Sequence, residues 1–156
     1  MLDHEPLLAL FQFGLGPAPG SLALLLNRIL LGLFFAISGF HKLFNKGRHA
    51  QLIATLRSSH IPLVGFNQWW VPAVEFLGGI ALVSGILAPL AAVALAVECL
   101  VAVATDGWKR IPAYRPIDKA DWFDDLLYLP EMLAIAALLV VVGLGPGVLT
   151  VPELLF

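Results

Sequence analysis

Four long stretches of apolar residues constrain this chain more than any other feature of its sequence. They cover residues 22–44, 70–87, 89–105 and 126–149. A helix needs about 20 residues to cross the ~30 Å hydrocarbon core of a bilayer, and each stretch comes close to that length. We therefore predict an all-α polytopic membrane protein, a single domain over residues 1–156, with four transmembrane helices in an antiparallel bundle.

The composition excludes a soluble monomer. Hydrophobic residues make up 60% of the 156 residues and charged residues only 13%, whereas soluble domains carry about 25% charged residues. The net charge of -2 provides no basic surface for nucleic acid, so the lipid bilayer is the expected partner. The one cysteine, Cys99, allows neither an internal disulfide nor a dithiol redox pair.

The segments outside the apolar stretches indicate an orientation. We predict an interfacial segment over residues 1–20, which end in a run of helix breakers, and a loop over residues 106–125. Eight of the nine Lys and Arg residues lie on the side of the first and third connections. By the positive-inside rule these two loops are cytoplasmic and both termini are periplasmic, in the inner membrane of a bacterium.

Ionisable residues inside the apolar stretches mark the candidate site. Each costs ~2.5–3.5 kcal/mol on insertion scales, so it is a functional candidate by default. Glu75, Glu98 and Glu131 come from the second, third and fourth stretches, and Lys42 lies near the end of the first. At 1.5 Å per residue they reach similar depths near the loop-bearing surface. We predict that Lys42 lies close to Glu75 or Glu131, and that these residues, with His41 as a further partner or relay, handle a proton or a ligand.

Structural roles are the alternative for each of these residues. Glu75 and Glu98 would then each belong to a buried structural ion pair or be a hydrogen-bonded neutral acid. Glu131 stands early in its helix, where a carboxylate favours the positive end of the dipole. Lys42 would snorkel to the headgroups, and His41, on the side of its helix opposite the glycines, would be a boundary residue.

Small residues share a stripe with the charged residues of the first and third stretches, as expected of helix faces that contact one another. Arg28 lies about 20 Å along the helix axis from Lys42, so we expect it to snorkel or to bond locally rather than to reach the acids. The two stripes comprise Arg28, Gly32, Phe35, Gly39 and Lys42 in the first stretch, and Ala91, Ala94, Glu98, Ala102 and Thr105 in the third.

Four short motifs follow one another along residues 24–149: R-x₃-G, G-x-x-K-L, E-x-x-G-G and G-P-G. Their order and placement resemble the DoxX family of small four-helix membrane proteins. The resemblance implies a subunit rather than a solitary enzyme, because members are associated with membrane oxidoreductase assemblies, including thiosulfate:quinone oxidoreductase, and with oxidative-stress complexes. The motif residues are Arg28 with Gly32, Gly39 with Lys42 and Leu43, Glu75 with Gly78 and Gly79, and Gly145, Pro146 and Gly147.

The leading hypothesis is therefore an accessory membrane subunit of a bacterial redox complex, in which carboxyl groups supply protons for quinone-linked or oxidative-stress electron transfer. The sequence holds no haem, flavin, iron–sulfur, dithiol or metal motif. We expect no cofactor of the chain's own, a quinone as the candidate ligand, and electrons from a soluble or membrane redox partner protein.

Two other functions stay open. Residues 106–125 are longer than the resemblance leads us to expect, and would dock a soluble partner if the chain is a membrane anchor or assembly protein. The acids would equally serve a proton-coupled carrier of a small molecule. Four helices are few for a monomeric carrier, so a homodimer is expected in that case.

Overall fold

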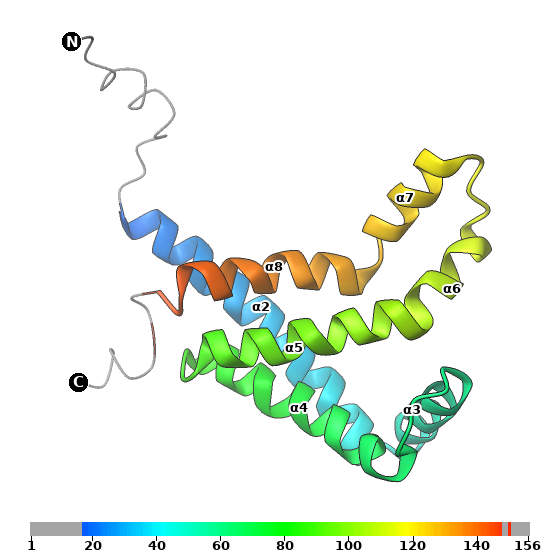
Figure 1. Ribbon diagram of the computed structural model, residues 1–156. Helices are drawn as coiled ribbons and strands as arrows, with labels where there is room; N and C mark the ends of the chain where they lie inside the picture. The colour runs from blue at the N-terminus through cyan, green and yellow to red at the C-terminus, as the bar shows by residue number, and fades with distance from the viewer. Residues whose placement is uncertain (1–16, 148–149, 151–156) are drawn as a thin grey trace.

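The computed structural model describes residues 17–147 and residue 150, and all regular elements in this part of the chain are helical (Figure 1). The all-α prediction is thus confirmed. The elements are α2 (Pro17–Phe44), α3 (Lys46–Ser58), α4 (Val64–Ser84), α5 (Ala88–Ala102), a π-helical turn (Val103–Gly107), α6 (Trp108–Arg110), a 3-10 turn (Ile111–Tyr114), α7 (Lys119–Leu127) and α8 (Pro130–Leu144).

Two helical segments of the described chain are long and apolar enough to cross a membrane, Leu22–Phe44 and Ala88–Tyr114. A third span exists if α7 and α8, which meet at 58°, count as one bent span. The described chain therefore has two or three candidate spans, and the four predicted spans and their antiparallel bundle are not confirmed. The helix α4 is not among these segments, and it carries Asn67, Gln68 and Glu75 among its apolar residues. With 15 residues, α8 alone is short for a crossing.

The helix boundaries differ from the prediction at both connections and at the start. Residues 17–20 begin α2 and residues 1–16 lie outside the described chain, so the interfacial segment over residues 1–20 stays a prediction. The first connection contains α3, which starts because Asn45 Oδ1 accepts hydrogen bonds from two backbone amides of its first turn. The predicted loop 106–125 contains α6, the 3-10 turn and most of α7. Asp118 caps the start of α7 in the same way as Asn45 caps α3.

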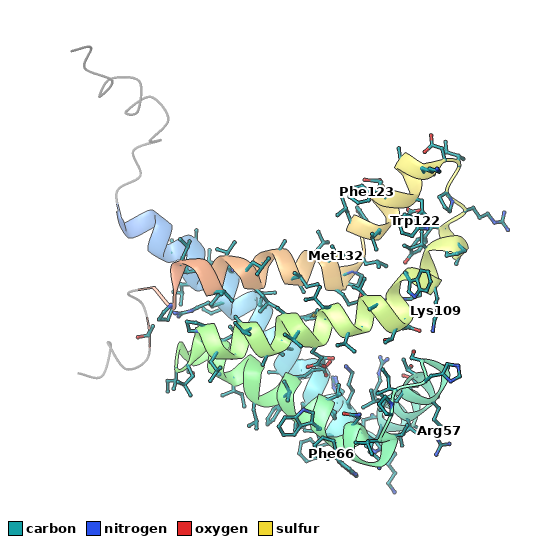
Figure 2. The ribbon with its side chains drawn as sticks, viewed as in Figure 1. Arg57, Phe66, Lys109, Trp122, Phe123 and Met132 are labelled. Carbon is teal, nitrogen blue, oxygen red and sulfur yellow. The ribbon has the colours of Figure 1, made fainter. Side chains whose placement is uncertain are left out.

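The helices form two pairs (Figure 1). The helices α2 and α4 pack against each other, α5 lies alongside α8, and contacts between α4 and α5 join the pairs. The helix α3 lies near one end of α4, and the α4–α5 turn is at the other end. Arg57 of α3, Lys109 of α6 and Trp122 of α7 gather at this same end of the molecule (Figure 2).

Glycines set the distance between α2 and α4. A Cβ atom on Gly32 would lie 2.6 Å from the carbonyl oxygen of Gly79, and one on Gly39 would lie 2.5 Å from the backbone nitrogen of Phe76. Both helices thus meet through backbone atoms, which only glycine permits. The predicted contact face of the first stretch is confirmed, since Arg28 and Phe35 of the same stripe are also buried.

The other end of α2 is tied to the chain that follows α8. Arg28 is buried and donates a hydrogen bond through Nη1 to the carbonyl oxygen of Pro146. Asn27 donates to the carbonyl oxygen of Ala137 in α8 at 3.0 Å. Of the two predicted alternatives for Arg28, local bonding is therefore the correct one, and the motifs R-x₃-G and G-P-G meet in space.

Candidate functional site

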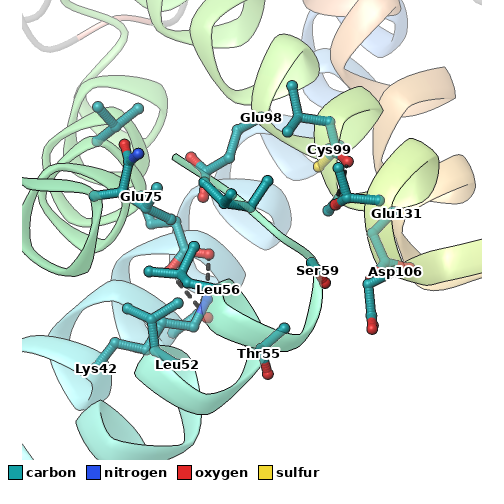
Figure 3. Close-up of a pocket in the computed structure, with 18 of the residues that line it drawn as sticks. Lys42, Leu52, Thr55, Leu56, Ser59, Glu75, Glu98, Cys99, Asp106 and Glu131 are labelled. Carbon is teal, nitrogen blue, oxygen red and sulfur yellow. Dashed lines mark hydrogen bonds and ion pairs between the residues drawn. The ribbon is translucent and has the colours of Figure 1, made fainter. Parts of the chain in front are cut away.

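A pocket of about 830 Å³ lies where the two helix pairs separate (Figure 3). Its size falls within the usual range for small-molecule sites, and apolar side chains form most of its wall. One side consists of α2, α3 and α4, and the other of α5, the turns that follow it, and α8. The apolar lining includes Phe34, Phe35, Leu52, Leu56, Trp70, Val74, Val97 and Val101.

An ion pair between α2 and α4 forms one polar corner of the pocket. The Nζ atom of Lys42 donates to Glu75 Oε1, and the Ser38 hydroxyl donates to Glu75 Oε2 at 3.3 Å. The Glu75 side chain is 8% exposed and that of Lys42 28%. Because Gly39 brings the helices together less than a turn before Lys42, this lysine reaches across. The predicted contact between Lys42 and Glu75 is confirmed.

Glu98 extends from α5 into the same space (Figure 3). Its carboxyl group lies close enough to that of Glu75 for the two to interact electrostatically. The oxygen Oε2 of Glu98 is buried without a hydrogen-bond partner. No ion pair reaches Glu98 from a cation in the described part of the chain. The structure therefore brings together two of the three predicted acids and provides no cation for Glu98 among the described residues.

The third acid has a partner that the sequence did not indicate. Glu131 at the start of α8 accepts a hydrogen bond from Arg110 Nη2 at 2.5 Å, and Asp106 Oδ2 lies 3.5 Å from Arg110 Nε. Lys42 therefore pairs with only one of its two predicted partners. The sequence signal was the i, i+4 spacing of Asp106 and Arg110, which is typical of a helix, within a segment predicted as a loop.

His41 is not among the residues that line the pocket. Its exposed ring lies beside that of Phe40, with centroids 6.0 Å apart. His41 lines a smaller cavity with Ser38, Lys42 and Arg48, so both its role as a partner or relay and the alternative of a boundary residue stay predictions. Nearby, His49 contacts the carbonyl oxygen of Lys42 through Nδ1 at 2.9 Å, and its ring packs at a tilt against that of Trp69. A loop histidine seven residues from its partner gave no sequence signal.

Of the small-residue stripe of the third stretch, Ala91 packs in the core as predicted, whereas the other members line the pocket instead of contacting another helix. The buried side of α5 lies about one residue further round, and Cys99 packs there in the core. The members that line the pocket face open space because the two helix pairs diverge at this end. Pocket residues from α5 and the turn after it include Ala94, Glu98, Ala102 and Thr105.

Ser59, at the end of α3, was not predicted as a site residue. It is 9% exposed, lines the pocket, and its hydroxyl oxygen has no hydrogen-bond partner. A serine between helices carries no sequence pattern that marks it. Among the residues that the structure describes, no group of three or more His, Cys, Asp and Glu side chains could hold a metal ion.

Comparison with known proteins adds one match. The family model described as DoxX matches residues 23–108, which is more than half of the chain. The matched region includes Lys42, Glu75 and Glu98, whereas Arg110 and Glu131 lie beyond it. No curated protein and no solved structure matches the chain.

Proposed function

Since the chain belongs to the DoxX family, we propose that it is an accessory membrane subunit of a bacterial redox complex whose pocket binds the headgroup of a quinone. The observation that carries this proposal is the carboxyl group of Glu98, for which the described residues provide no cation, inside an apolar pocket beside the Lys42–Glu75 ion pair. Apolar walls suit the ring and the first part of the tail of a quinone.

Quinone reduction takes up protons together with electrons, and a carboxyl group that faces the headgroup can supply them. Glu98 is the proton donor in this proposal. Lys42 is 28% exposed and Arg110 37% exposed, so the rim of the pocket reaches the surface at these two side chains. Protons return to Glu98 along this rim.

Electrons come from a redox partner protein, because the chain supplies no cofactor motif of its own. The segment between α5 and α8 offers a surface for that partner. Trp122 and Phe123 of α7 are partly or largely exposed there (Figure 2), as are Trp108 and Tyr128. Lipid headgroups are the other environment that suits such aromatic residues.

We place this end of the molecule in the cytoplasm and both termini in the periplasm, with the chain in the inner membrane. Eight of the nine basic residues support this orientation. A periplasmic reporter fused after Phe156 should be active, and one inserted near Arg57 should be inactive. The opposite pair of results would reverse the orientation.

The quinone itself can be tested by filling the pocket. Purification in native lipid should yield bound quinone with the wild-type chain, and Ala102→Trp, which places a large ring in the pocket, should lose it. Ala136→Trp is the matched control, because Ala136 is an exposed residue of α8 outside the pocket lining. Equal quinone content in all three proteins would refute quinone binding here.

The role of Glu98 needs a second measurement on the complex with its co-purified partner. Glu98→Gln should keep the quinone bound but lower quinone-dependent turnover by about 10²-fold, the usual range for loss of a general acid. Unchanged turnover would remove Glu98 from proton transfer.

A further inference from the structure

The charged side chains around the pocket are unequally matched. Four carboxyl groups and two cationic groups line it. Lys42 forms an ion pair with Glu75, and Arg110 forms ion pairs with both Glu131 and Asp106. Glu98 is therefore the lining carboxyl group for which the described residues supply no cation.

A carboxyl group in apolar surroundings is neutralised either by a proton or by a bound cation. Lys42 does not take this role, because its Nζ atom bonds Glu75. A proton and a cationic ligand would therefore compete for Glu98. Each would remove the same unfavourable charge, so binding of one displaces the other.

Two further features of the pocket suit an amphipathic cation with N–H groups. Phe34, Phe35 and Trp70 contribute aromatic side chains to its wall, and ring faces attract ammonium groups. Ser59 presents a hydroxyl oxygen that is buried in the same pocket and has no partner, so it can accept an N–H hydrogen bond. A volume of about 830 Å³ admits a compact apolar body with one ammonium group.

We propose that the pocket binds a small amphipathic ammonium ion, which replaces the proton on Glu98. The ammonium group pairs with the Glu98 carboxylate, the O–H bond of the acid breaks, and its proton leaves as one hydrogen ion along the rim near Lys42. Through this exchange the ion pairs stay in place among the other titratable groups of the lining. These groups are Lys42 from α2, Glu75 from α4, Cys99 from α5, Asp106 and Arg110 from the turns after α5, and Glu131 from α8.

This exchange goes beyond quinone binding and does not depend on it. It also assigns Glu98 a chemistry distinct from that of Glu75, since both acids lie in one layer but only Glu75 has a cation of the protein's own. The same exchange would give a proton-coupled carrier its coupling step.

The test uses three probes with one apolar cage: 1-adamantylamine, 1-adamantanol and 1-adamantanecarboxylate. Their binding to the full chain in lipid nanodiscs is measured by calorimetry, with empty nanodiscs as the blank for partition into lipid. The amine should bind at least about tenfold more tightly than the alcohol, as expected of a charge-assisted contact, and the carboxylate should bind least. Similar affinities for amine and alcohol would overturn the proposal.

Proton release is measured in two buffers of different ionisation enthalpy. The amine should release up to about one proton per molecule bound, and its affinity should rise by up to about tenfold per pH unit while it stays protonated. Release occurs on binding, so higher pH favours the complex. An affinity that is independent of pH, with no proton released, would show that the cation does not replace a proton.

Glu98→Gln isolates the residue. It should abolish both the preference for the amine and the proton release, while binding of the alcohol, unchanged, shows that the pocket is intact. Asp121→Asn, on α7 outside the pocket lining, is the matched control and should behave as wild type. A preference that survives in Glu98→Gln would refute the assignment. Quinone binding without amine binding rejects this inference alone, and amine binding without quinone binding rejects only the proposed function.

Discussion

The contact between α2 and α4 and the pocket beside it are built in opposite ways. In the contact, glycines let backbone atoms of the two helices meet. In the pocket, side chains from the two helix pairs face a common space without filling it. The helix α2 takes part in both. The tight contact therefore sets the edge of the pocket, while the side chains of the pocket wall can contact a ligand.

Two glutamates, one in the tight helix contact and one in the pocket, differ in the same way in their charged partners. Glu75 belongs to the tight helix pair, and both of its oxygens accept hydrogen bonds, from Lys42 and Ser38. Glu98 belongs to the other pair, and its Oε2 accepts none. Removing one partner of a buried ion pair leaves the other charge without compensation, which is costly. A buried acid without a cationic partner depends on a proton or a ligand.

The largest effect on stability should come from the glycine contact. Gly39→Ala should lower the free energy of unfolding by about 3 kcal/mol, the upper part of the range for overpacking, because backbone atoms 2.5–2.6 Å away cannot turn aside. Denaturation in mixed detergent micelles measures this change. Gly143→Ala, where a Cβ atom meets nothing within 4 Å, should be neutral or stabilise by up to about 1 kcal/mol. Equal effects of the two substitutions would mean that α2 and α4 do not meet at Gly39.

The ion pair should come second. Lys42→Met should cost about 2 kcal/mol, less than the ~3–5 kcal/mol for a fully buried pair, because Lys42 is 28% exposed. Lys46→Met in the exposed start of α3 should change stability by less than about 0.5 kcal/mol. Adding Glu75→Gln to Lys42→Met should restore part of the loss, since neither charge is then left alone. A double variant no more stable than Lys42→Met would argue against the pair.

The tight contact could be predicted from the sequence, and the pocket could not. Two glycines seven residues apart in the first stretch, Gly32 and Gly39, mark one face of one helix, and Lys42 lies on that face. The depth of each residue in the membrane, estimated from the rise along straight helices, then places Glu75 within reach of Lys42. Both predictions use only spacing within a single helix and the need to pair charges in an apolar medium.

The pocket depends on how far the helix pairs diverge, which is a property of all helices together. For this reason the stripe around Glu98 was predicted as a helix contact, and most of it lines a pocket instead. Arg110 was missed because the apolar pattern ends before it, although the helical turns continue through a π-helical segment. No periodicity within one helix reveals where a neighbouring element turns back.

Arg110 tests how much the rim of the pocket contributes. Arg110→Met should lower stability by about 1 kcal/mol or less, because the side chain is 37% exposed and ion pairs near the surface contribute little. Arg115→Met, which removes a basic residue outside the pocket lining, is the control and should leave stability unchanged. A loss near that of Lys42→Met would mean that the rim is as firmly built as the helix contact.

The smallest effect on stability should come from Glu98, even though it is the residue most closely tied to function. Glu98→Gln removes no ion pair and leaves an amide of nearly the same shape in the pocket. Stability should therefore change by less than about 0.5 kcal/mol, whereas Glu75→Gln leaves Lys42 without its partner and should lower it clearly. The two variants, measured in the same micelles, give the contrast directly. Equal losses would mean that Glu98 has a structural partner after all, and its carboxyl group would then not be available for a proton or a ligand.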